Sequence, residues 1–147
     1  MQKKPPRDYS HIGLTVDQWN SLVTKEPRRW FVAFVPPLDK RWWHRFFHRT
    51  HKHCFAMTPL SDGTWVLFEP WWSRLMVSML KQEEAEKFLK WATLGDSLWI
   101  YERIPGRSSQ VKVWMSCAVL IAHLLGQDCW CWTPHSLYKR LKKMEQK

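Results

Sequence analysis

The chain has 147 residues, of which 45% are hydrophobic, and its formal net charge is +10 at pH 7. This length and hydrophobic content predict one domain with a sizeable core and argue against a largely disordered chain. No apolar run approaches the length of about 18 residues that marks a membrane-spanning helix, so no membrane span is expected. The first residues lack the apolar segment of a secretory signal, so secretion by a signal peptide is not expected either.

The charge distribution and the cysteines indicate how the chain is organised. Residues 1–10 have the composition of a basic flexible arm, and residues 11–147 are expected to form a single domain that ends in a helix over about residues 134–145. The four cysteines are Cys54, Cys117, Cys129 and Cys131. Because cysteines without a secretory signal are usually reduced, we expect thiols rather than a disulfide framework.

In chain order, apolar spacing and end signals predict helices and short strands. Helices are expected over residues 15–25, 38–48, 81–95, 117–125 and 134–145, the third ending at Gly95 and the fourth at Gly126. Strands are expected over residues 29–35, 52–60, 65–72, 73–80, 97–104 and 110–115. The segment 61–64, "SDGT", predicts a hairpin turn. Since most strands are joined by hairpins or short turns, we expect an α+β fold with a mainly antiparallel sheet flanked by helices.

The stretch "VWMSCAVLIAHLLG" places a cysteine at the start of an apolar helix. Ser116 fits the N-cap position, which makes Cys117 the first helical residue. A free cysteine at such a position is often a packing residue, because free Cys is among the most buried residue types. It can instead be reactive, because a helix N-terminus favours an anion and lowers the pKa of a thiol.

A nucleophilic cysteine needs a base, and the base needs a group that orients it. His123 lies six residues after Cys117 on the same helix, about two turns away and on another face, so it cannot be the partner. His53 lies at the start of the strand predicted over 52–60, and Glu69 lies just before Pro70, which breaks the strand paired with it in the 61–64 hairpin. Both residues therefore belong to the same open end of the hairpin. A carboxylate there can hold an imidazole in one tautomer.

Two segments, "HKHCFAM…SDGTWVLFEPWW" and "WMSCAVLIAHLLG…CWTPHSLYKRL", resemble the circularly permuted papain-like fold. That superfamily includes the NlpC/P60 cell-wall peptidases and the lecithin-retinol acyltransferase-like enzymes, and the pattern is similar to small phage-encoded members. The resemblance covers about residues 30–141 and implies Cys117 as nucleophile, His53 as base and Glu69 as third residue. It further implies a cysteine hydrolase of amidase, peptidase or acyl-transfer type that works through an acyl-enzyme on a peptide or acyl substrate, without a cofactor.

The resemblance also implies a phage protein, found in the bacterial host cytoplasm or in the virion. The alternative function is a non-catalytic virion structural or assembly protein on the same fold. Such a protein would dock on a viral structural protein or a cell-wall partner through basic and Trp-rich surfaces. The basic residues of segments 39–53 and 139–147 also predict weak, non-specific nucleic acid binding.

Histidines and cysteines offer a rival chemistry, because zinc is bound by these side chains. Residues 44–54 hold four histidines and Cys54, and a second group, Cys129, Cys131 and His135, lies downstream. No pair has the Cys-x2-Cys spacing, so we predict no metal site. Whether Cys129, Cys131 and His135 bind zinc stays open at this stage.

Overall fold

The computed structural model describes residues 10–13, 26–38, 48–71, 74–103, 116–129 and 131–146. The predicted helix over 15–25, most of the predicted helix over 38–48 and the predicted strand over 110–115 lie outside the described residues. The first nine residues of the predicted basic arm lie outside them as well.

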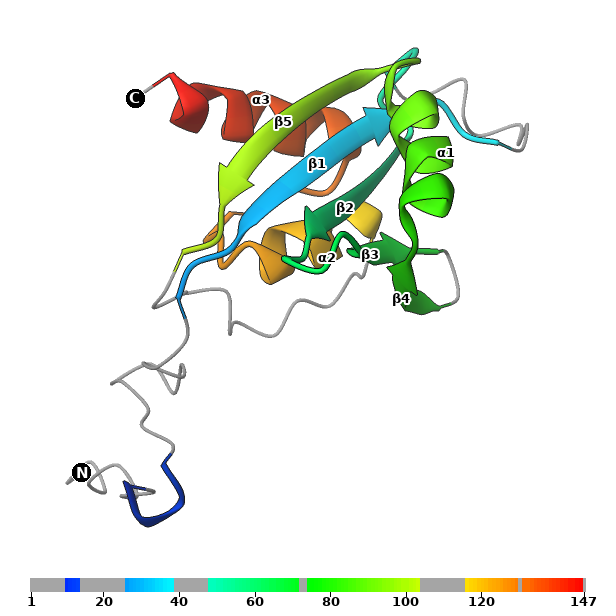
Figure 1. The fold of residues 1–147 in the computed structure, drawn as a ribbon. Coiled ribbons are helices and arrows are strands. Elements are labelled where there is room, and N and C mark those ends of the chain that lie inside the picture. The colour runs from blue at the N-terminus through cyan, green and yellow to red at the C-terminus, as the bar shows by residue number, and fades with distance from the viewer. Residues whose placement is uncertain are drawn as a thin grey trace, which may run out of the picture.

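Within those ranges the chain is α+β, with a five-stranded antiparallel sheet in the order β4-β3-β2-β1-β5 (Figure 1). The strands are β1 (Arg29–Val35), β2 (His53–Pro59), β3 (Trp65–Pro70), β4 (Leu75–Leu80) and β5 (Asp96–Tyr101). The helices are α1 (Gln82–Ala92), α2 (Cys117–Leu124) and α3 (Pro134–Glu145), preceded by a short 3-10 turn η1 (Ser10–Ile12). The predicted fold class and the antiparallel sheet are therefore confirmed.

Helices cover both faces of the sheet (Figure 1). Strand β1 has alternating side chains in two separate cores: Phe31, Ala33 and Val35 pack with α1, whereas Val32 and Phe34 pack with α2 and α3. This explains why the strand is a continuous apolar run, since a strand buried on both faces has no polar side to alternate with. None of the helices in the described part of the chain has the length and apolar content needed to cross a bilayer.

The predicted hairpin turn is present and fixes the register of β2 on β3. The Leu60 N–H donates to the Thr64 carbonyl at 2.8 Å, and Gly63 has a φ of +84°, which favours glycine. Ala56 then lies opposite Phe68, so β2 begins beside the end of β3. The hairpin thereby brings the first residue of β2 next to the last residues of β3.

Both ends of α2 follow their predicted signals. The Ser116 side chain accepts a hydrogen bond from the Val119 N–H at 3.2 Å, which makes Ser116 the N-cap. At the other end Gly126 has a φ of +65°. The N–H groups of Gly126 and Gln127 donate to the carbonyls of His123 at 3.1 Å and Ala122 at 2.9 Å. This pair of bonds is a Schellman motif, so the helix stop at Gly126 is confirmed.

The prediction that Gly95 ends a helix by its own conformation is wrong. Helix α1 ends at Ala92 with Thr93 as its C-cap. Gly95 has no left-handed backbone; a Cβ at this position would lie 1.9 Å from the carbonyl oxygen of Phe34 in β1. The glycine is required there because the chain passes too close to a neighbouring strand for any side chain.

Candidate active site

The imidazole of His53 and the carboxylate of Glu69 meet at the open end of the β2–β3 hairpin. The distance from His53 Nε2 to Glu69 Oε1 is 3.5 Å, and the two side chains are 16% and 3% exposed. Both atoms are buried, and neither has a hydrogen-bond partner among the described residues. Contacts between catalytic groups are often long in the absence of substrate and shorten in the reacting complex, so this spacing suits a base and the carboxylate that orients it.

The thiol of Cys117 interacts with the same imidazole from the first position of α2. Burial lowers the pKa of His53, but its interactions with Cys117 and Glu69 outweigh burial and raise that pKa to about 9. An ordinary histidine has a pKa near 6.5 and is mostly neutral at pH 7. His53 in this site is therefore an imidazolium at neutral pH.

The pKa of Cys117 is shifted in the opposite direction. A hydrogen bond from the Cys54 thiol is the main cause that lowers this pKa well below its ordinary value. Burial opposes the shift, and hydrogen bonding and charge interaction with His53 add to it. The α2 N-terminus, where a partial positive charge favours an anion, acts in the same direction. The two shifts have opposite directions and favour the thiolate of Cys117 and the imidazolium of His53, the charged forms that a cysteine nucleophile uses.

Cys54 also belongs to this site. From the sequence, this cysteine was considered only as a metal ligand. It is fully buried, and burial together with its hydrogen bond to Cys117 raises its pKa well above the ordinary value, so it stays a thiol and donates. Strand alternation is the signal that could have identified it. Cys54 follows His53 on β2, so its side chain faces the side of the sheet that α2 covers.

Two tryptophans hold the His53 ring. The indole of Trp91 stacks on it, with ring centroids 5.6 Å apart and planes 17° apart, and Trp71 lies at 6.0 Å. The Trp91 Nε1–H donates to the Pro36 carbonyl at 3.0 Å, which fixes that indole in turn. An imidazolium over an indole face gains a cation–π attraction, so the stacking favours both the orientation and the charge of His53.

Backbone N–H groups at the start of α2 complete the polar groups around Cys117. The first N–H groups of a helix have no acceptor within the helix. The Ser116 side chain accepts that of Val119, and the N–H groups of Cys117 and Ala118 belong to the same first turn of the helix. Such donors can stabilise negative charge on the oxygen of a carbonyl under attack.

The structure thus brings Cys117, His53 and Glu69 together, and their catalytic roles remain predictions. His123 is exposed on α2, away from the first turn. Comparison of the chain with protein-family models, with curated proteins and with solved structures found no match. The case for function therefore depends on the geometry and electrostatics of this site.

Proposed function

We propose that the chain is a cysteine hydrolase of amidase, peptidase or acyl-transfer type that works through an acyl-enzyme on Cys117. The observation that carries the proposal is the placement of the buried imidazole of His53, with its Nε2 3.5 Å from Oε1 of the buried Glu69, beside the cysteine that begins α2. The pKa of His53, raised to about 9, and the lowered pKa of Cys117 agree with this placement. A cysteine that only fills space in a core has its pKa raised by burial, the opposite of the shift at Cys117. The pairing supports a nucleophile rather than a packing residue.

The proposed reaction follows from the positions of the groups. The Cys117 thiolate adds to the carbonyl carbon of the substrate, and the electron pair of the C=O bond moves to its oxygen, which accepts hydrogen bonds from the Cys117 and Ala118 N–H groups. The His53 imidazolium gives its proton to the leaving amine, alcohol or thiol as the tetrahedral intermediate collapses. Neutral His53 then removes a proton from water, whose oxygen adds to the carbonyl carbon of the acyl-enzyme. Collapse of this second tetrahedral intermediate breaks the C–Sγ bond, releases the acid and returns the Cys117 thiolate beside the His53 imidazolium. Glu69 orients the imidazole throughout.

The order of the elements supports a permuted papain-like architecture as part of this proposal. The histidine strand β2 comes first, the carboxylate strand β3 second and the cysteine helix α2 last, which is the order that the sequence resemblance implies. Origin in a phage, with the protein in the host cytoplasm or in the virion, is proposed on that resemblance alone.

The proposal is tested with an activated ester, p-nitrophenyl acetate, and the full chain. We expect release of nitrophenol together with an acetyl adduct on Cys117 that forms and then decays. Peptide mass spectrometry monitors the adduct. Cys117→Ala should abolish both. His53→Ala should slow turnover by roughly 10² to 10⁴, the usual range for a general acid–base group, and Glu69→Gln by less.

His123→Ala is the matched control, because this exposed histidine belongs to the same helix as Cys117 and has no proposed role. It should leave both adduct formation and decay unchanged. Turnover that survives in Cys117→Ala, or an adduct spread evenly over the accessible nucleophiles of the chain, would overturn the proposal.

A second candidate is the non-catalytic structural or assembly protein. The observation that favours it is a row of exposed apolar side chains on the edge strand β4: Leu75 is 43% exposed, Val77 62% and Met79 67%. Exposed contiguous apolar surface often marks an interaction site. This candidate predicts that Cys117 carries no acetyl adduct beyond that of an ordinary thiol, and that His53→Ala changes nothing.

A further inference from the structure

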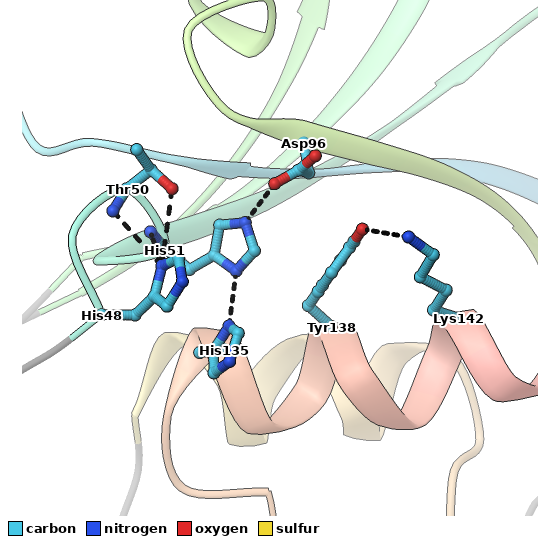
Figure 2. A network of polar contacts seen from close by, with 7 residues as sticks. All are labelled: His48, Thr50, His51, Asp96, His135, Tyr138 and Lys142. Atoms are coloured by element: carbon cyan, nitrogen blue, oxygen red, sulfur yellow. Dashed lines mark hydrogen bonds and ion pairs between the residues drawn. The ribbon is translucent and has the colours of Figure 1, made fainter.

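Three histidines from distant parts of the chain gather outside the Cys117 site (Figure 2). His48 and His51 lie just before β2, and His135 lies in the first turn of α3. One ring nitrogen from each lies within 4.8 Å of the others. Among the described residues this is the one group of three or more His, Cys, Asp or Glu side chains with ligand atoms so close together.

His51 is oriented as a metal ligand would be. It is 2% exposed, and its Nε2 contacts Oδ2 of Asp96, the first residue of β5, at 2.5 Å. The carboxylate holds the ring proton on Nε2, which leaves Nδ1 as the nitrogen with an available lone pair. Metal-binding histidines commonly donate their second N–H to a carboxylate in this way, because it fixes the tautomer and the ring orientation.

The Nδ1 atoms of His51 and His135 face each other at 2.8 Å (Figure 2). Two such atoms share one proton in the absence of a metal. If that proton leaves, both lone pairs point into the same space. Ligand nitrogens about 2.0–2.1 Å from a tetrahedral zinc ion lie about 3.3 Å apart, so these two rings need to separate by only about half an ångström.

His48 completes the group and is its most weakly prepared member. Its ring stacks on that of His135 with centroids 3.9 Å apart and planes 9° apart. Its Nδ1 accepts hydrogen bonds from the backbone N–H groups of Thr50 at 3.3 Å and His51 at 3.1 Å. An ion would compete with these donors for that lone pair. Because His48 is exposed, its ring has room to turn toward the ion.

We propose that His48, His51 and His135 bind a divalent transition-metal ion, zinc in the first place, with Asp96 orienting His51 and water as the fourth ligand. Imidazole ligands suit zinc, copper and nickel, whereas magnesium and calcium require oxygen ligands. The ion would join the segment before β2, the start of β5 and the start of α3, and so act as a structural clip. This site is separate from the Cys117 site and does not depend on the proposed activity.

The experiment titrates Zn²⁺ into the chelator-treated full chain by calorimetry and Co²⁺ by visible absorption. We expect one ion per chain, the spectrum of tetrahedral cobalt and a higher melting temperature with zinc. His135→Ala should weaken binding at least tenfold, Asp96→Asn by roughly 10- to 100-fold, and His48→Ala by less than His135→Ala. His51 is buried, so His51→Ala is a poor test because the variant can fail to fold. Asp96 is exposed, so the fold is expected to tolerate Asp96→Asn.

Two controls separate this site from other ligands. His123→Ala removes an exposed histidine elsewhere, and the double variant Cys129→Ser/Cys131→Ser removes two thiols whose sulfur atoms lie 3.0 Å apart. Both should bind zinc as the unchanged chain does. The absence of a stoichiometric ion, or binding that survives in His135→Ala and disappears in the double variant, would overturn the proposal. None of these measurements involves turnover, so the result for the metal site is independent of the hydrolase proposal.

Discussion

His53 has three kinds of neighbour, and each acts on a different property of the ring. Glu69, at 3.5 Å from Nε2, provides the negative charge that a protonated ring needs in a buried position. Trp91 fixes the plane of the ring by stacking. The Cys117 sulfur interacts with the His53 ring by a hydrogen bond and by charge, and it favours the protonated ring. The hairpin predicted Glu69 as a neighbour of His53, and the resemblance to the permuted papain-like fold implied Cys117. Trp91 comes from α1, and no local pattern connects it with His53.

The two pKa shifts affect stability in opposite ways. The raised pKa of His53 stabilises the fold fully below pH 6.5, its ordinary pKa, and this contribution is lost as pH rises through about 9. The lowered pKa of Cys117 stabilises the fold fully above its ordinary pKa of 9.0, and this contribution is lost as pH falls through its folded-state pKa. Between pH 6.5 and 9 the two contributions change in opposite directions with pH, so they offset each other.

A pH dependence of the free energy of unfolding is expected at acid pH, where it can be measured. Below pH 6.5 His53 is protonated in both the folded and the unfolded chain, so the folded pair binds fewer protons than the unfolded chain for as long as Cys117 is a thiolate. The free energy of unfolding should then fall by about 1.4 kcal/mol per pH unit, down to the folded-state pKa of Cys117. Urea unfolding at several pH values, compared with the double variant Cys117→Ala/His53→Gln, isolates this slope. Equal slopes in the two proteins would contradict the charged pair.

At the scale of elements, the ends of α2 and α3 were predictable because capping is local. The side chains of Ser116 and Thr133 both act as N-caps. Each accepts a hydrogen bond at 3.2 Å from the backbone N–H three residues later. The contacts of Gly95 were not predictable, because they involve β1, some sixty residues earlier in the chain. Signals carried within one turn can thus be found in the sequence, whereas close approaches between strands cannot.

The matched caps give a second prediction. Ser116→Ala and Thr133→Ala should each lower the free energy of unfolding by about 1 kcal/mol, since each removes one N-cap. Only Ser116→Ala should also slow the alkylation of Cys117, because only α2 begins at that thiol. Urea unfolding and iodoacetamide labelling measure the two effects. Equal slowing by both variants would mean that general loosening, rather than the α2 N-terminus, controls the thiol.

At the scale of the whole molecule, the sequence predicted the antiparallel sheet and the hairpin that joins β2 to β3, but not the pairing of β5 with β1. A hairpin has a short connection and a turn signal, whereas β1 and β5 pair over a separation of sixty residues or more. That long-range pairing places Asp96 beside His51, where the carboxylate orients one ring of the histidine group. The prediction of no metal site was based on spacing along the chain. Spacing carries no information about side chains that come together from distant parts of the sequence.

The Cys117 site is assembled by the whole fold, from β2, β3 and α2 together. Its most direct test is the pH dependence of Cys117 alkylation by iodoacetamide, followed by peptide mass spectrometry in the unchanged chain and in His53→Gln. Cys129 and Cys131 serve as internal references.

We predict fast labelling of Cys117 at pH 7, with an apparent pKa well below its ordinary value of 9.0 and a clear rise of that pKa in His53→Gln. A Cys117 that titrates like an ordinary thiol, with no response to the loss of His53, would contradict the account.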